Sequence, residues 1–257
     1  MELKHRVAIV TGAVGVIGQG ICRTLARHGM RIAVADLDLA RCNQFAGELN
    51  ATGATATGVA VDVTSKASTE DMARKVVETF GEIDVLVNNA GIIALGSLVD
   101  LAEEKWDHVI NVNLKGPFLC AKAVAPYMIA RKSGRIINMS SVAAKRPSPL
   151  QSAYAASKHG IVGLGQVWCQ ELAAYNITVN TICPGFIDSS MWRDHLGPAL
   201  APAFDSTPAQ LIDTLARAFM PLGHPQTADD IGQAVAYFAM ADNVSGQTLA
   251  IDGGFTM

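Results

Sequence analysis

The chain has 257 residues, of which 50% are hydrophobic, and a formal net charge of −3 at pH 7 with a pI near 6.0. Such a small negative charge gives no long-range attraction for nucleic acid or an anionic membrane, so neither is expected as a partner. The length and composition suffice for a large core in one α/β domain, and we predict a single domain over residues 1–257.

The cysteines and histidines form no disulfide or metal-binding pattern. The five cysteines include no C-x-x-C pair and the six histidines are scattered, which favours buried, reduced thiols and no catalytic metal. No apolar run approaches the roughly 18 to 20 residues of a membrane span. The first predicted strand begins at Val7 and leaves no room for a signal peptide, so we expect a cytoplasmic protein.

Short apolar runs, typical of buried strands, alternate with longer stretches of helical periodicity. The runs occupy residues 7–10, 32–35, 58–61, 84–87, 136–139, 178–182 and 248–251. Parallel strands covered on both faces need continuous apolar sequences of this kind. We therefore predict a Rossmann-type, doubly wound α/β fold with a seven-stranded parallel sheet and helices on both faces. The stretch 51–60, rich in Ala, Thr and Gly, is interpreted as a loop entering the third strand.

A glycine-rich turn follows the first strand, with Gly12, Gly15 and Gly18 near the start of a predicted helix over 17–26. Glycine permits a tight turn and lets a pyrophosphate approach the backbone, while free amides at the N-terminus of a helix attract the anion. Tight turns also need glycine for purely structural reasons, so the turn alone is a weak signal. Together with the next strand, its spacing predicts a dinucleotide site.

The second predicted strand ends at Asp36, eighteen residues after Gly18. A carboxylate there accepts hydrogen bonds from the adenosine ribose hydroxyls and repels a 2′-phosphate. No lysine or arginine occupies positions 13–19 or 37, so we predict NAD as the cofactor. Asp36 could also be the N-cap of a helix over 39–49, and the two roles are compatible.

Ser141, Tyr154 and Lys158 form a second group of candidate residues. If residues 153–172 are helical, Tyr154 and Lys158 lie one turn apart on the same face. A nearby ammonium group stabilises a phenolate, so Lys158 would lower the pKa of Tyr154 and allow it to act as a general acid/base. Ser141 follows the strand at 136–139, where its hydroxyl could hold a carbonyl or alcohol oxygen. A surface Tyr/Lys pair is the ordinary alternative, but the dinucleotide motif favours a catalytic site.

Together these motifs resemble the short-chain dehydrogenase/reductase family over essentially the whole chain. Five further segments carry the resemblance: Asp62-Val63, Asn88-Asn89-Ala90-Gly91, Asn113, Pro184-Gly185 and the final VSGQTLAIDGG. It implies that Asp62 and Val63 flank the adenine ring and that Asn89, Ala90 and Gly91 line the cofactor cleft. It also implies that Asn113 is a fourth catalytic residue, holding a water in a proton relay, and that Lys158 binds the nicotinamide ribose. Ser189, with the backbone of Ile187, would bind the nicotinamide carboxamide beside Pro184 and Gly185.

The glycine motif departs from the classical members of this family. Val16 stands where they have glycine, and the Gly12-x-x-Gly15-x-x-Gly18 spacing resembles that of extended members. Gly12, Gly15, Val16, Ile17 and Gly18 remain the predicted cofactor-binding turn. Because valine is strained at positive φ, we expect the special backbone angle at Gly15.

Residues 189–222 break the simple alternation of strand and helix, because four prolines interrupt short helical patterns. The resemblance implies an insertion that covers the substrate. Packing within that insertion is an equally good explanation for its apolar side chains. The candidate substrate residues are Ser141, Val142, Gln151, Tyr154, Phe186, Met191, Trp192 and His195. Of these, Gln151 could bind a second hydroxyl group, as a polyol would require.

These observations predict an oxidoreductase that transfers a hydride between NAD(H) and a secondary alcohol or polyol and its ketone. Oxidation is preferred because oxidised NAD usually predominates in cells. One alternative is an NADPH-dependent 3-oxoacyl or other carbonyl reductase, and a more distant one is a non-catalytic dinucleotide sensor or scaffold. The resemblance further implies a homotetramer that packs through the helices near 112–131 and 153–174.

Overall fold

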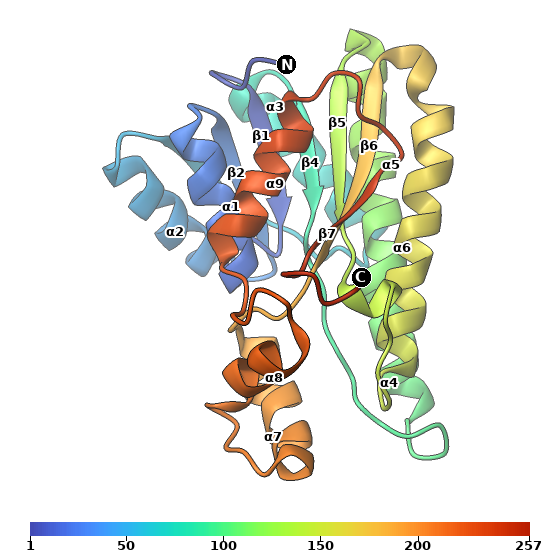
Figure 1. Ribbon diagram of the computed structural model, residues 1–257. Coiled ribbons are helices and arrows are strands. Elements are labelled where there is room, and N and C mark those ends of the chain that lie inside the picture. Colours follow the sequence, from blue (N-terminus) through green and yellow to red (C-terminus); the bar gives the residue numbers. More distant parts are fainter.

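The computed structural model describes residues 1–257 and contains one seven-stranded sheet in the order β3-β2-β1-β4-β5-β6-β7 (Figure 1). All neighbouring strands are parallel. The strands are β1 (Val7–Thr11), β2 (Arg31–Asp36), β3 (Thr55–Ala60), β4 (Val85–Asn88), β5 (Gly134–Met139), β6 (Ile177–Pro184) and β7 (Thr248–Ile251). The strand order reverses between β1 and β4, which confirms the predicted doubly wound, Rossmann-type fold.

Nine α-helices connect or follow these strands. They are α1 (Val16–Arg27), α2 (Leu39–Ala51), α3 (Lys66–Phe80), α4 (Glu103–Ile110), α5 (Gly116–Arg131), α6 (Ser152–Glu171), α7 (Gly197–Leu200), α8 (Leu211–Phe219) and α9 (Ala228–Met240). None of them combines the length and the apolar character that a membrane span requires.

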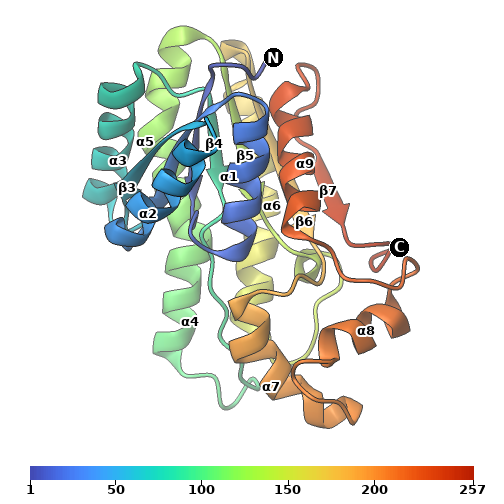
Figure 2. The same cartoon turned by 90° about the vertical axis from the view of Figure 1, so that its left-hand side faces the viewer.

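The sheet has a hydrophobic core on each face because its strands are apolar on both sides. Ala8 and Val10 of β1 belong to the core formed with α1, α2 and α9. Val7 and Ile9 point the other way, into the core formed with α3, α5 and α6. Figure 2 shows α9 on one side of the strands and α3 and α5 on the other. This double coverage explains the continuous apolar runs in the sequence.

The prediction of a loop over residues 51–60 is wrong. Helix α2 continues to Ala51, and after a short turn at residues 52–54 the edge strand β3 pairs with β2 along its full length. An edge strand is only half covered, so Thr, Ala and Gly suffice where an apolar run was expected. Gly58 is required by close packing, since a Cβ atom there would lie 2.7 Å from the backbone nitrogen of Asn43 in α2.

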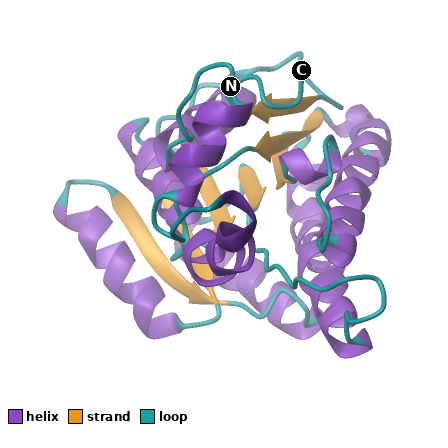
Figure 3. Ribbon diagram, turned by 60° about the horizontal axis from the view of Figure 1, so that its bottom comes forward, coloured by secondary structure: helices purple, strands orange, loops and turns teal.

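The segment after β6 extends away from the sheet. Short helices α7 and α8 lie beyond the carboxyl ends of the strands (Figure 1). Figure 3, with this end of the molecule forward, shows a short helix in front of the strands. The fold therefore brings the predicted insertion to the same end of the sheet as the glycine turn, Asp36 and Ser141.

Candidate active site

A cleft of about 1190 Å³ opens at the carboxyl ends of the strands. All of the predicted cofactor-binding residues line it, as do Ser141, Tyr154 and Lys158. Most predicted substrate residues line it too, but His195 does not. His195 is exposed in the π-helical turn Trp192–Leu196, of which Trp192 and Leu196 line the cleft, so the structure does not bring its side chain to the site.

The glycine turn places its positive φ angle at Gly12 (+64°), not at Gly15 as predicted. A Cβ atom on Gly12 would lie 2.8 Å from the Cα of Ala90, and one on Gly18 would collide with the Gly12 carbonyl oxygen. Gly15 is extended (φ −77°) and forms the N-cap of α1. Because the chain turns at Gly12, Val16 enters α1 in an ordinary helical conformation.

The start of α1 fits an anionic ligand. No side chain caps this helix, and the residues that carry its first free amides, Val16 and Ile17, line the cleft. Such amides attract a phosphate group. Asn89 fixes the turn in place, because its Nδ2 donates to the carbonyl oxygens of Thr11 (2.9 Å) and Gly12 (3.1 Å). These features suit the pyrophosphate of a dinucleotide.

Asp36 lies at the end of β2, where its carboxylate accepts hydrogen bonds from the backbone amides of Leu37 (2.8 Å) and Val14 (3.3 Å). The N-cap of α2 is Asp38, which accepts from the amide of Arg41 at 3.1 Å, so Asp36 does not have the alternative capping role. Arg41 also lines the cleft. This cation was not predicted from the sequence, because only the first turn of α2 brings it back towards Val14, where its Nη2 lies 3.5 Å from the Val14 carbonyl oxygen.

Asp62 and Val63 follow β3 and line the cleft. Oδ1 of Asp62 accepts hydrogen bonds from the amide (2.9 Å) and the hydroxyl (2.7 Å) of Thr64, which shapes this loop. Val63 packs so closely against Gly116 of α5 that a Cβ atom on the glycine would lie 2.9 Å from Cγ2 of the valine. One oxygen of Asp62 therefore has a structural role, and Val63 supports the wall of the cleft.

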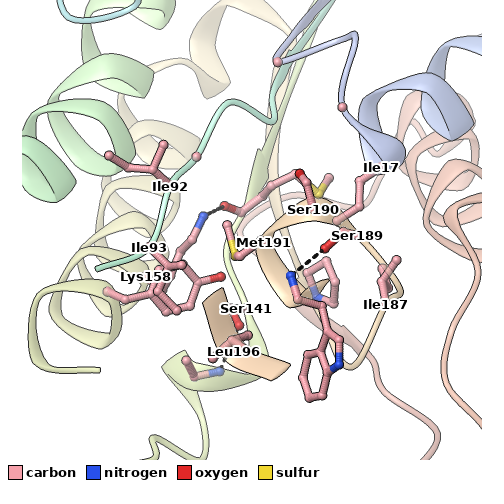
Figure 4. Close-up of a pocket in the computed structure, with 18 of the residues that line it drawn as sticks. Ile17, Ile92, Ile93, Ser141, Lys158, Ile187, Ser189, Ser190, Met191 and Leu196 are labelled. Atoms are coloured by element: carbon pink, nitrogen blue, oxygen red, sulfur yellow. Dashed lines mark hydrogen bonds between the residues drawn. The ribbon is translucent and has the colours of Figure 1, made fainter. Parts of the chain in front are cut away.

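Ser141, Tyr154 and Lys158 come together from two elements. Ser141 lies just after β5, and α6 begins at Ser152 and carries the other two side chains. The Nζ of Lys158 lies 5.5 Å from the centre of the Tyr154 ring and donates a 2.9 Å hydrogen bond to the carbonyl of Met139. Figure 4 shows Lys158 and Ser141 in the same pocket, with Ile93 and Met191 nearby. All three candidate side chains are buried.

Burial dominates the acid–base properties of this group. Removal from water raises the pKa of Tyr154 above its ordinary value, and the Ser141 hydroxyl offsets only part of this shift. The same effect lowers the pKa of Lys158 to about 8. The expectation that Lys158 gives Tyr154 a net lowered pKa is therefore not met in this structure, because desolvation of the buried phenol dominates the shift.

Asn113 does not line the cleft but lies directly behind it, in a π-helical turn over Asn111–Lys115. Its side chain accepts a hydrogen bond from the amide of Ile92 and donates to its carbonyl, both at 2.8 Å, and also donates to Ser157. Gly91 separates it from the site: a Cβ atom there would lie 3.4 Å from the Lys158 Nζ and 3.5 Å from the Asn113 Oδ1. Short π-helical turns of this kind often occur at functional sites.

The surroundings of Tyr154 are apolar. Its ring belongs to a small buried cluster with Ile93 and Ala143, against which Met191 and Leu196 pack. Further apolar side chains line the cleft: Phe186, Trp192, Leu200, Phe204, Leu215, Phe219 and Phe255. Ile93, Leu196 and Phe255 had no sequence signal, because distant parts of the chain bring them to the site.

Comparison with known proteins identifies the family. A model of the short chain dehydrogenases matches residues 6–197. The chain is 35% identical to a 3-oxoacyl-(acyl-carrier-protein) reductase of Thermotoga maritima over 100% of both proteins. It is 37% identical to galactitol 2-dehydrogenase of Agrobacterium fabrum, over 99% of this chain and 98% of the relative. A crystal structure of an actinorhodin polyketide ketoreductase variant with NADPH superimposes with a TM-score of 0.93 at 34% identity, covering 98% of this chain and 97% of that one.

The chain therefore belongs to the short-chain dehydrogenase/reductase family and is an oxidoreductase. Members of this family bind a nicotinamide dinucleotide, and the cleft is lined by the glycine turn and by Ser141, Tyr154 and Lys158. The two relatives named above have different substrates, so family membership alone does not assign the substrate of this chain.

Proposed function

We propose that this protein transfers a hydride between NAD(H) and a secondary alcohol and its ketone, with Tyr154 as the general acid/base. The observation that carries the proposal is the position of Ser141, Tyr154 and Lys158 in the same cleft as the glycine turn and Asp36. A proton-transfer group, an oxygen-binding group and a dinucleotide site are the parts that this reaction requires. They lie at the carboxyl ends of parallel strands, where ligands bind in open α/β folds.

Each residue of the proposed reaction centre has a distinct role. In reduction, Ser141 donates a hydrogen bond to the carbonyl oxygen, and Tyr154 gives that oxygen its proton; in oxidation, Tyr154 takes the proton back. The bound cofactor supplies or accepts the hydride at the substrate carbon. Lys158 binds the nicotinamide ribose and favours the charged form of Tyr154, and Asn113 connects Lys158 to a proton relay behind Gly91.

The proposed cofactor site extends along the strand ends. The glycine turn and the start of α1 bind the pyrophosphate, and Asp36 binds the adenosine ribose. Asp62 and Val63 flank the adenine, and Ser189 with the backbone of Ile187 binds the carboxamide. The remaining cofactor-binding residues are Asn89, Ala90, Gly91, Pro184 and Gly185. Residues 189–222 act as a cover within the single catalytic domain 1–257.

A second candidate function is NADPH-dependent reduction of a ketone. Two observations favour it: Arg41 lines the cleft near Asp36, and the superimposed ketoreductase was crystallised with NADPH. A polyol, as used by the galactitol dehydrogenase relative, is less suited to the apolar surroundings of Tyr154. The intact set of Ser141, Tyr154 and Lys158 argues against a sensor or scaffold without turnover.

The test is a turnover assay with both cofactors. Purified protein is given secondary alcohols, polyols, hydroxysteroids and the corresponding ketones, and the absorbance of NADH or NADPH is followed. Alcohol oxidation with NAD supports the proposal, and faster ketone reduction with NADPH supports the second candidate. Dinucleotide binding without turnover of any of these compounds contradicts both.

We propose a homotetramer as the assembly. Phe118 of α5 and Val167 of α6 expose 42% and 50% of their surface, and these two helices are the ones that the family resemblance assigns to subunit contacts. Exposed apolar side chains on neighbouring helices are typical of an interface. Static light scattering tests the proposal, because a mass of 27.0 kDa at all concentrations would mean a monomer.

A further inference from the structure

The charges that line the cleft are divided between its two ends. Both aspartates lie near one edge of the sheet, because Asp36 is the last residue of β2 and Asp62 follows β3. Arg146 and Arg193 line the part formed after β5 and β6, where Ser141 and Tyr154 lie. No carboxylate side chain lines that part. The substrate end of the cleft therefore has two arginines and no carboxylate among its lining residues, and its interior is apolar.

The two arginines differ in what they contact. Arg193 pairs with Asp188 at 3.0 Å, which neutralises it. Arg146 forms no ion pair: its Nη1 donates to the carbonyl oxygen of Phe255 at 3.1 Å, and its guanidinium carbon lies 4.6 Å from the centre of the Phe255 ring. A guanidinium group has five N–H donors in a planar fork that suits a carboxylate or phosphate. Arg146 therefore retains donors for an anion.

Arg146 is held close to the reaction centre. Its backbone amide donates to the carbonyl of Val142 at 2.7 Å, and Val142 follows Ser141 directly. The centre of the Phe255 ring, beneath the guanidinium, lies 5.0 Å from the centre of the Phe186 ring. The Phe186 and Trp192 ring centres lie 5.4 Å apart. These three aromatic rings line the cleft. The cation thus stands at the end of an aromatic wall that leads into the site.

We infer that the substrate is an amphipathic ketone or secondary alcohol, with a bulky apolar body against the aromatic wall and an anionic group bound by Arg146. This inference rests on the proposed function and specifies its substrate class. A polyol would leave the apolar wall in contact with hydroxyl groups, whereas an aromatic or branched body would bury apolar surface there. The anionic group gains a charge-assisted hydrogen bond only if it reaches the rim.

The experiment uses matched pairs of ketones that differ only in charge. The probes are 4-oxo-4-phenylbutanoate, its homologues with one and two more methylene groups, and the methyl ester of each. For each pair, kcat/KM for reduction is measured with NADH and NADPH, using the full chain and the variants Arg146→Gln, Arg146→Lys and Lys145→Gln. Lys145→Gln is the control. It removes the same charge from the neighbouring residue, whose side chain does not line the cleft.

We expect at least one acid to be preferred to its ester, and Arg146→Gln to lower kcat/KM for that acid by about 10- to 100-fold, with less than about a 2-fold effect on the ester. Arg146→Lys should restore part of the loss, and Lys145→Gln should leave the acid/ester ratio unchanged.

An equal loss on acid and ester would mean that Arg146 only anchors the C-terminal segment, which overturns the inference. Equal use of acid and ester by the unmodified chain also overturns it, while the proposed function stands. The inference is also overturned if the protein reduces none of the probes with either cofactor, or if it oxidises only polyols. In those cases, the turnover assay with the broader panel of alcohols and ketones decides whether the proposed function fails too.

Discussion

The Nζ of Lys158 lies 5.5 Å from the centre of the Tyr154 ring, and its hydrogen bond goes to the carbonyl of Met139 at 2.9 Å. This bond joins α6 to the end of β5, two residues before Ser141. The strand that positions Ser141 therefore also positions the lysine beneath the tyrosine. The arrangement is rigid because the lysine, the tyrosine and the strand end are all buried.

Tyr154→Phe tests the proposed proton transfer directly. The substitution removes only the phenolic hydroxyl, and its ring can keep its contacts with Ile93 and Ala143. We expect kcat/KM to fall by about 10²- to 10⁴-fold, the usual contribution of a general acid/base. Circular dichroism and dinucleotide affinity should stay close to those of the unmodified chain. Near-normal turnover of the variant would mean that another group transfers the proton.

The buried Lys158 should make stability depend on pH. Its pKa falls from 10.5 in the unfolded chain to about 8 in the folded protein, because burial disfavours the charge. Between these values the unfolded chain binds more protons, so the contribution of Lys158 to the free energy of unfolding rises with pH. Below pH 8 the penalty for burying the charge is fully present, and above 10.5 it is absent.

Lys158→Met removes this titration. We expect the stability of the variant relative to the unmodified chain to decrease by on the order of 3 kcal/mol between pH 7 and pH 10.5, because only the unmodified chain gains stability over that range. Urea denaturation at several pH values measures the difference. Tyr154 is present in both proteins, so its own titration largely cancels. Parallel stability curves would show that Lys158 titrates near its ordinary pKa.

Residues close together in the chain were predictable, and residues brought together by the tertiary structure were not. The Tyr154/Lys158 pair needs only the helical repeat, and Asp36 needs only the end of a strand. In contrast, Arg146 meets Phe255 from 109 positions away. The third strand was predicted at 58–61, whereas β3 begins at Thr55, because half-covered strands lack a continuous apolar run. The positive φ angle at Gly12 could not be predicted, because it depends on the close approach of Ala90, which follows β4.

Gly15 and Gly18 provide a matched pair for testing the turn. A Cβ atom on Gly15 would meet only the Gly12 carbonyl oxygen, at 3.4 Å, and its φ of −77° suits alanine. On Gly18 the atom would also lie 2.7 Å from the Cα of Ala13. Gly15→Ala should therefore keep the melting temperature within a few degrees but weaken dinucleotide binding by about 10-fold, since it narrows the site where phosphate approaches the backbone.

Gly18→Ala should instead destabilise the folded protein by about 1–3 kcal/mol, because the backbone contact forces the turn to shift. Thermal unfolding and titration with NAD separate the two effects. Equal loss of stability in both variants would mean that Gly15 also has a packing role.

Cofactor choice should depend on Asp36 and Arg41. Asp36 uses its carboxylate to accept hydrogen bonds from Val14 and Leu37, and Arg41 lies in the same part of the cleft. In the unmodified chain, repulsion between Asp36 and a 2′-phosphate should give NAD the higher kcat/KM. Asp36→Asn removes the repulsion and leaves Arg41 to attract the phosphate. We expect the NADP/NAD ratio of kcat/KM to rise by about 10-fold or more.

Asp38→Asn is the control for this prediction. It makes the same change in charge two residues away, and asparagine preserves the N-cap of α2. The ratio should therefore change little in Asp38→Asn, whereas adding Arg41→Gln to Asp36→Asn should cancel most of the gain. If the unmodified chain already prefers NADP, Arg41 outweighs Asp36 and the NAD assignment is wrong. A ratio that does not respond to Asp36→Asn would mean that the carboxylate, held by two backbone amides, does not reach the 2′ position of the ribose.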